Sequence, residues 1–362
     1  MPDDPSSADL TVPITGRRLA LPDGPIFSLR RAGEADYEIG EFRAWAGYRN
    51  LGSDAATDGL AHVQHVLSFA GTDDAGRTGI HAHLAHAHIV IPTSGRGIFS
   101  YDGVLTEAAP GAVIVQHGGT VHDQFSYTYA AASDAENRRT PQWVERPPAW
   151  APATSFGFLE LFVPMVFANV DVIPPDAVTP LDQASAWDHP YHLAGARFHL
   201  QAEGDPEAGY RPLDGREDLE VRDAGTWGPT AGLVATWIVR PVSDVAPTGA
   251  PLGLGIAGES GGIEIFYMVS GSARFRRDDG EAVRLEAGDT CTCSQGALTL
   301  PEDAPADMRL LVLFIAARAQ NLRERTADEI RRLEALGPGI IRRREVRPDG
   351  DTRPVNCLRG AG

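Results

Sequence analysis

The segment Gly79–Pro92 reads GIHAHLAHAHIVIP, and the segment Gly111–His122 reads GAVIVQHGGTVH. The first segment carries His81, His83 and His88 ahead of an apolar run, and the second places a fourth histidine behind another apolar run. Residues i and i+2 of a strand share a face, so both imidazoles of the HAH triplet can point inward. Neutral imidazole is the commonest protein ligand of first-row divalent ions. The pattern predicts one mononuclear metal site built on β-strands.

The two segments resemble the two sequence motifs of the cupin superfamily. In that family a glycine and HxH are followed by a glutamate and a further glycine, and the second motif runs glycine, five residues, PxG, two residues and a histidine. Here the second motif ends at His122, with His117 where the family has proline, and His88 stands where the family usually has glutamate. The glycines that match are Gly95, Gly111 and Gly119. The resemblance implies jelly-roll barrels, also called double-stranded β-helices, with the metal inside.

The metal site has an ordinary alternative. A single inward histidine is more often a hydrogen-bonded core residue than a ligand. Four histidines at these offsets, inside two glycine-framed motifs, favour His81, His83, His88 and His122 as ligands. His86 is left open between a surface turn residue, which we favour, and an alternative ligand to His88.

Length and composition predict two all-β domains. A chain of 362 residues exceeds the usual size of one hydrophobic core, and its 39 glycines and 27 prolines separate short apolar runs. The apolar run from Phe156 to Ile173 is interrupted by Glu160 and Asp171, and no run is long enough to span a membrane. The acidic start has no basic region followed by an apolar one, as a signal peptide would. We therefore expect a cytoplasmic protein.

Charge and residue usage exclude several function classes. A formal net charge of −17 disfavours nucleic acid and acidic membranes as partners. The chain contains no lysine, which excludes Schiff-base and pyridoxal-phosphate chemistry. Its 3 cysteines make no disulfide framework, and Cys291 and Cys293, two residues apart, are expected to be reduced thiols, as is Cys357.

The sequence repeats itself, which predicts a duplicated domain. Tyr48–Leu60 matches Val221–Leu233 at a constant offset of 173 residues. Three further matches follow in the same order: His88–Gly95 with Glu264–Gly271, Gly111–His122 with Gly288–Thr299, and Phe158–Val163 with Leu310–Ile315. Four ordered matches indicate a bicupin, with the resemblance covering residues 41–170 and 214–317.

The second copy keeps the frame of the first but not its ligands. Ala257-Gly258-Glu259 replaces HxH, Thr299 replaces the last histidine, and Glu264 alone could still bind a metal. We expect this half to be structural and metal-free, with a partner surface or a second small-molecule pocket as the alternative.

The expected domain boundaries follow from the repeat. They are an N-terminal arm (1–40), a cupin with the metal site (41–170), a linker (171–213), a degenerate cupin (214–320), and a helix with a tail (321–362).

Strands are expected at 112–116, 264–269, 273–276 and 308–315, and hairpin turns at 101–103 and 278–280. A capping box at Thr326–Glu329 and an apolar stripe predict a short C-terminal helix that ends at Gly337. The insertion 123–155 fits a lid over the barrel mouth or a surface excursion equally well.

The ligand set predicts the chemistry. Imidazoles without a carboxylate leave a bound ion its full charge, which favours an anionic, chelating small-molecule substrate. A bicupin with one active half resembles the gentisate and hydroxynaphthoate ring-cleaving group, and that resemblance implies an Fe(II) dioxygenase that uses O2. His88 would be a fourth ligand or a catalytic proton donor, and Gln64 or Arg96 would orient a substrate carboxylate.

Other readings remain open. The site could hold Mn, Ni or Zn for redox-neutral isomerase, lyase or decarboxylase chemistry, or the chain could be a non-catalytic metal- or ligand-binding protein. Exposed barrel edges predict a homodimer.

Overall fold

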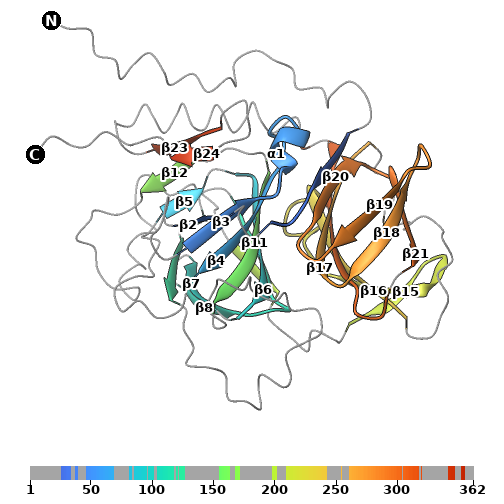
Figure 1. The fold of residues 1–362 in the computed structure, drawn as a ribbon. Helices are drawn as coiled ribbons and strands as arrows, with labels where there is room; N and C mark the ends of the chain where they lie inside the picture. The colour runs from blue at the N-terminus through green and yellow to red at the C-terminus, as the bar shows by residue number, and fades with distance from the viewer. Residues whose placement is uncertain are drawn as a thin grey trace, which may run out of the picture.

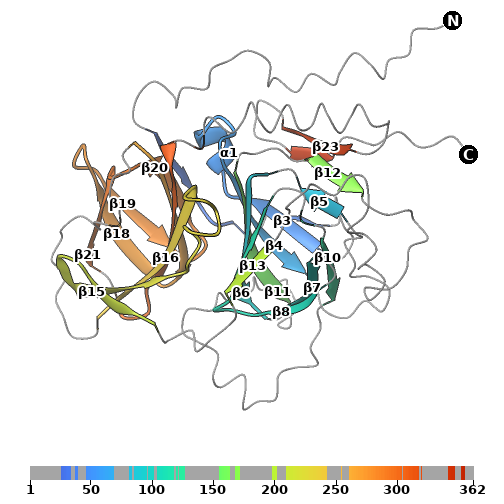
Figure 2. The same ribbon diagram turned by 180° about the vertical axis from the view of Figure 1, so that it is seen from behind.

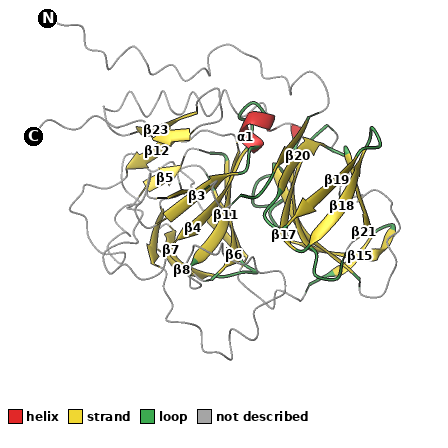
Figure 3. Cartoon of the chain, viewed as in Figure 1, coloured by secondary structure: helices red, strands yellow, loops and turns green. Residues whose placement is uncertain are grey.

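The computed structural model describes parts of both halves of the chain. The described residues are 26–33, 37–39, 46–68, 81–83, 85–95, 97–101, 104–117, 120, 122–126, 155–163, 168–171, 198–201, 209–242, 254, 261–303, 305–317, 319, 341–346 and 352–354. They form two β-barrels that lie side by side, as both views of the ribbon show (Figure 1, Figure 2). The predicted all-β fold class is confirmed, since strands account for nearly all the described secondary structure (Figure 3).

The first barrel is built from two facing sheets. One has the strand order β13-β9-β6-β11-β4-β3-β2, and the other has the order β24-β23-β12-β5-β10-β7-β8. The bounds are β2 (Glu38–Ile39), β3 (Ala46–Asn50), β4 (His62–Ser68), β5 (His81–His83), β6 (Ala87–Ser94), β7 (Gly97–Tyr101), β8 (Val104–Ala108), β9 (Val113–Gln116), β10 (His122–Ser126), β11 (Phe156–Val163), β12 (Ala168–Asp171), β13 (Phe198–Gln201), β23 (Ile341–Val346) and β24 (Thr352–Pro354). The short helix α1 (Ser53–Ala56) connects β3 to β4.

The second barrel has a larger sheet of order β1-β20-β17-β22-β16-β15-β14 and a smaller one of order β19-β18-β21. The bounds are β1 (Phe27–Arg30), β14 (Arg211–Leu213), β15 (Arg216–Asp223), β16 (Val234–Pro241), β17 (Ile263–Ser270), β18 (Ser272–Arg277), β19 (Ala282–Glu286), β20 (Thr290–Ser294), β21 (Leu298–Asp303) and β22 (Arg309–Ile315). The predicted strands at 112–116, 264–269, 273–276 and 308–315 therefore all exist.

Strand registers confirm the predicted repeat residue by residue. In the first barrel Phe162 pairs with His88 on one side and with His62 on the other. In the second barrel Phe314 pairs in the same way with Glu264 and Ala235. These pairs match the offsets read from the sequence, so the residues occupy equivalent places.

The turn before β4 is reproduced before β16. Gly52, Asp58 and Gly59 have positive φ in the first copy, and Gly225, Ala231 and Gly232 have it in the second. In both turns a threonine, Thr57 or Thr230, closes the loop through its hydroxyl group. Ala231 shows that the backbone dictates this geometry even where the residue is neither glycine nor asparagine.

The two barrels exchange edge strands. β1, which precedes the first barrel in sequence, pairs with β20 of the second barrel. β13, which precedes the second barrel, pairs with β9 of the first barrel (Figure 2). Phe27 and Phe198 take equivalent registers in these pairs, so the structural repeat begins earlier than the matches at 41 and 214, inside the predicted arm and linker.

A shared apolar core joins the barrels. It contains Ile89, Ile91 and Leu161 of the first barrel together with Ile265, Tyr267 and Leu313 of the second, among other residues. Two equivalent arginines cross this interface reciprocally. Arg49 donates to the carbonyl oxygen of Gly288 (3.2 Å), and Arg222 donates to the carbonyl oxygen of Gly111 (3.1 Å). The sequence repeat around these arginines thus corresponds to a pseudo-twofold clamp between the barrels.

Two hairpin turns, a C-terminal helix and an insertion were also predicted from the sequence. The hairpin β7–β8 pairs Tyr101 with Val104, and Gly280 has a φ of 85° in the β18–β19 turn, so both predicted hairpins are present. The predicted helix at 326–337 and residues 127–154 of the insertion lie outside the described residues. No helix among the described residues is long and apolar enough to cross a membrane.

Candidate metal centre

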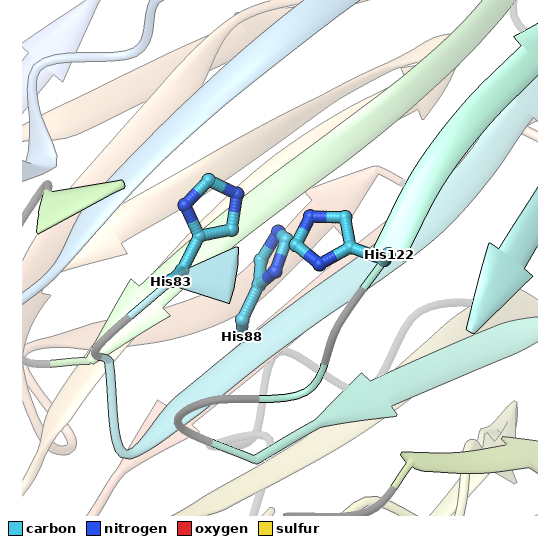
Figure 4. Close-up of side chains that lie close together, drawn as sticks. All are labelled: His83, His88 and His122. Atoms are coloured by element: carbon cyan, nitrogen blue, oxygen red, sulfur yellow. The ribbon is translucent and has the colours of Figure 1, made fainter. Parts of the chain in front are cut away.

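Three histidines from both sheets of the first barrel point toward one another (Figure 4). His83 ends β5, His122 begins β10, and His88 comes from β6 in the facing sheet. One ring nitrogen from each can be chosen so that all three atoms lie within 4.8 Å of one another. The three side chains are buried, with exposed fractions of 9%, 6% and 2% for His83, His122 and His88.

Strand geometry explains this convergence. β10 pairs antiparallel with β5, and His122 lies directly opposite His81 in that ladder. Residues opposite each other in a ladder share a face, as do residues i and i+2 of a strand, so His83 and His122 project to the same side of this sheet. The side chain of His81 is outside what the structure describes, so its place as a further ligand stays a prediction.

Hydrogen bonds indicate which ring nitrogen of two of these histidines can bind a metal. The Nδ1–H of His122 donates to the carbonyl oxygen of Thr120 (3.0 Å), which leaves Nε2 as its lone-pair atom. The Nε2–H of His88 donates to Oε1 of Glu160 (2.9 Å), which leaves Nδ1. That Nδ1 atom is buried and has no hydrogen-bond partner among the described residues. Such pairing of the second ring nitrogen with a carbonyl or carboxylate is typical of metal-binding histidines, so these residues fit a bound ion.

Glu160, which the sequence motifs do not single out as a site residue, lies directly behind the histidine cluster. Its carboxylate accepts from His88 and from Nε2 of Gln64 (2.6 Å). Burial raises the pKa of Glu160, but these two donors and the charge of His88 outweigh burial and leave the pKa below its usual value. No carboxylate belongs to the histidine cluster of the described residues, but the Glu160 carboxylate stands directly behind it and would offset part of an ion's charge. The signal was a lone glutamate at the centre of the apolar strand β11.

Aromatic rings surround the histidines. Phe162 stacks on His88 at 4.2 Å with an interplanar angle of 10°, and meets His83 edge-on at 5.1 Å. Tyr101 stacks on His122 at 6.0 Å. Burial raises the pKa of Tyr101 well above its ordinary value, so the phenol keeps its proton. An apolar wall of this kind strengthens electrostatic interactions within the site.

The other predicted site residues have different locations. Gln64 is buried behind the histidines, where its amide contacts Glu160 and His62, so its role in substrate binding stays a prediction. His86 is half-buried in the bend between β5 and β6 and does not belong to the three-histidine cluster. Arg96 lies outside the described residues.

The second barrel carries other residues at the equivalent positions. Glu264 replaces His88, and Cys293 replaces Gln116 as its neighbour across the ladder. The Glu264 carboxylate accepts from the backbone N–H of Gly296 (2.9 Å), and burial raises its pKa to about 7. Cys291 and Cys293 are buried free thiols, and their mutual hydrogen bond together with burial raises the pKa of Cys293. The Cys293 thiol is therefore a poor nucleophile.

Comparison with known proteins supports the fold. Residues 255–307, in the second barrel, match the model of the EutQ-like cupin domain, which supports a place in the cupin superfamily. No curated protein matches the chain in sequence.

Several solved structures resemble about 80% of the chain distantly. A 7S globulin of Momordica charantia has 12% identity and a TM-score of 0.46, over 81% of this chain and 82% of its own. An oxalate decarboxylase variant of Bacillus subtilis has 13% identity and a TM-score of 0.45, over 80% and 76%. An Escherichia coli pirin in complex with nickel(II) has 12% identity and a TM-score of 0.41, over 80% and 99%.

Proposed function

We propose that the chain is a mononuclear metal-dependent dioxygenase that acts with O2 on a small aromatic or enolic anion. His83, His88 and His122 would hold the ion, Fe(II) in the first place. The observation that carries the proposal is the convergence of three buried imidazoles, two of which have their second nitrogen already engaged by an acceptor. Fe(II) at such a site would supply Lewis acidity and a redox couple that lets a substrate react with O2.

The protein's own groups prepare the site for an anionic substrate. Three neutral imidazoles leave the charge of a divalent ion unchanged, and the Glu160 carboxylate offsets about half of it. The remaining positive charge favours one anionic group on the substrate. Phe162 and Tyr101 are buried against the histidines, where they can exclude water. Tyr101 would keep its hydroxyl proton throughout.

Metal content is the first test. The wild-type chain, purified without chelators and reconstituted anaerobically with Fe(II), should hold about one ion per chain by plasma mass spectrometry. His88→Ala should lose the ion, because it removes a ligand atom from the cluster. His86→Ala is the matched control, since it removes a histidine of the same segment that is not in the cluster. Equal metal content in these two variants would contradict the site.

Oxygen uptake decides the reaction class. With iron and a panel of hydroxylated aromatic and enolic acids, the proposal expects substrate-dependent O2 consumption that His88→Ala abolishes. Substrate turnover without O2, supported by Mn, Ni or Zn, would replace the dioxygenase with a redox-neutral isomerase, lyase or decarboxylase. Ligand-induced thermal shifts without any turnover would instead indicate a binding protein. A homodimer and a cytoplasmic location belong to the same proposal, and sedimentation of the purified chain tests the dimer.

A further inference from the structure

We propose that Asp54, His62 and Gln64 form a buried hydrogen-bonded relay that positions the metal ligand His88 through Glu160. These three would be positioning residues, since they act on the ion only through another side chain. The inference rests on the proposed metal site. If the relay exists, residues near the second barrel contribute to the metal affinity of the first barrel.

The relay is a continuous chain of contacts. Glu160 Oε2 accepts from Nε2 of Gln64 (2.6 Å), and Oε1 of Gln64 lies 3.4 Å from Nε2 of His62. Nδ1 of His62 lies 3.4 Å from Oδ2 of Asp54. Asn50 donates to the same Oδ2 (3.0 Å), and the backbone N–H of Ala55 donates to Oδ1 (2.9 Å). The chain thus connects α1 to β4, β11 and finally β6.

The direction of each hydrogen bond follows from the groups involved. The Glu160 carboxylate can only accept, so Gln64 must turn its NH2 group toward it and its oxygen toward His62. That oxygen can only accept, so its contact calls for an N–H at Nε2 of His62. The Asp54 carboxylate also can only accept, and both bonds form at once only when His62 carries a proton on each ring nitrogen. The hydrogen bonds thereby connect the orientation of the Asp54 side chain to the orientation of the Glu160 side chain.

Alternation along β4 explains why two relay members face Glu160. His62 and Gln64 are residues i and i+2 of the strand and share the inner face of the barrel, whereas His65 points to the opposite face. There His65 bonds to Tyr37 (2.7 Å) and Thr93 (3.0 Å), and its ring stacks on Tyr267 of the second barrel.

The second barrel shows that the fold does not require this polar chain. Registers and the constant offset place Trp227, Ala235, Trp237 and Val312 where the first barrel has Asp54, His62, Gln64 and Glu160. Ala235, Trp237 and Val312 are buried, with exposed fractions of 2%, 5% and 0%.

Burial makes the polar version costly. The side chains of His62 and Asp54 are 0% and 1% exposed, and Gln64 is 4% exposed as a residue. Buried polar groups of this kind are unfavourable unless each is hydrogen-bonded, and apolar residues in the same places would be the simpler solution. The copy with the histidine cluster has the polar chain, and the copy without it has apolar residues. This correlation within one molecule indicates that the polar residues serve the metal centre and are not needed to form the barrel.

The relay also reaches the neighbouring barrel. α1, which carries Asp54, lies beside β1 and β20 of the second barrel (Figure 1). The relay therefore begins at a helix that contacts both barrels.

The test compares two buried histidines on opposite faces of β4. His62→Ala copies the residue of the second barrel and should weaken metal binding by about threefold to tenfold, less than the loss expected for a residue that contacts a ligand directly. His65→Ala removes an equally buried histidine outside the relay and should change the metal dissociation constant less than about twofold. The dissociation constant is measured for the full chain by competition with a chelator, using Co(II), whose visible spectrum reports ligand geometry.

A double-mutant cycle separates positioning from general destabilisation. Glu160→Ala alone should weaken binding about 10- to 100-fold, because it removes the acceptor of both His88 and Gln64. Adding His62→Ala to Glu160→Ala should cause less than about a twofold further loss, because the link to His88 is already broken. If His62→Ala fails to fold, the nearly isosteric Asp54→Asn should still weaken binding about threefold.

Each outcome decides one of the two proposals. A wild-type chain that binds no metal ion would overturn the proposed function and the relay with it. Normal binding by wild type, combined with equal constants for His62→Ala and His65→Ala or with fully additive losses in the cycle, would overturn the relay alone.

Discussion

Replacement of Glu264 by glutamine should remove a pH-dependent loss of stability from the second barrel. Burial raises the pKa of this carboxyl from 4.5 to about 7 in the folded chain. Since the folded pKa lies above the unfolded one, the protonated group is favoured in the fold, and stability falls as pH rises from the unfolded value through about 7. The displacement corresponds to about 3 kcal/mol once the group is ionised in both states.

The assay is urea unfolding of wild type and Glu264→Gln at matched pH values. The difference in unfolding free energy, variant minus wild type, should rise by about 2–3 kcal/mol between about pH 5 and about pH 8.5. Taking the difference cancels the titration of all other groups. The new amide can still accept from Gly296, so any change that it makes to the unfolding free energy by itself does not depend on pH. Glu286→Gln, which removes an exposed carboxylate of the same barrel, is the control.

A difference that stays flat over this range, or one that falls with pH, would refute the reasoning. Either result would mean that the interior of the second barrel solvates an ionised Glu264, by water or by donors beyond Gly296. The second barrel would then be a candidate for a polar binding site rather than a structural copy.

Two further predictions concern packing. Phe162→Ala should lower the unfolding free energy by about 3–5 kcal/mol and also weaken metal binding, because the ring is buried and stacks on His88. The equivalent Phe314→Ala should lower the unfolding free energy by a similar amount and leave metal binding unchanged. Calorimetry measures the stability of each variant, and chelator competition measures its metal binding. Arg49→Leu and Arg222→Leu should each lower stability by about 1–3 kcal/mol in urea unfolding, because each strips an interface carbonyl of its donor; no loss in either variant would argue against the clamp between the barrels.

The metal centre was only partly predictable. Local spacing brought out His83, His88 and His122, because strand alternation and short glycine-framed motifs are properties of neighbouring residues. Glu160 and His62 gave a weaker signal. Glu160 lies 72 residues from His88 in sequence, and their contact exists only because β11 pairs with β6 in one register. A one-residue slip would turn Glu160 to the other face of the sheet.

The sequence by itself determined the all-β class, the duplication and the equivalence of positions such as His88 and Glu264, since these follow from residue type, periodicity and offset. Tertiary structure decided which strands are neighbours. β1 pairs with a strand more than 250 residues away, and β13 makes the reciprocal exchange. The tertiary structure also decided that Asp54, His62 and Gln64 are connected to His88 through Glu160. Pairing over such separations depends on how the two barrels bury their shared core, and that is a property of the packed chain rather than of any segment of it.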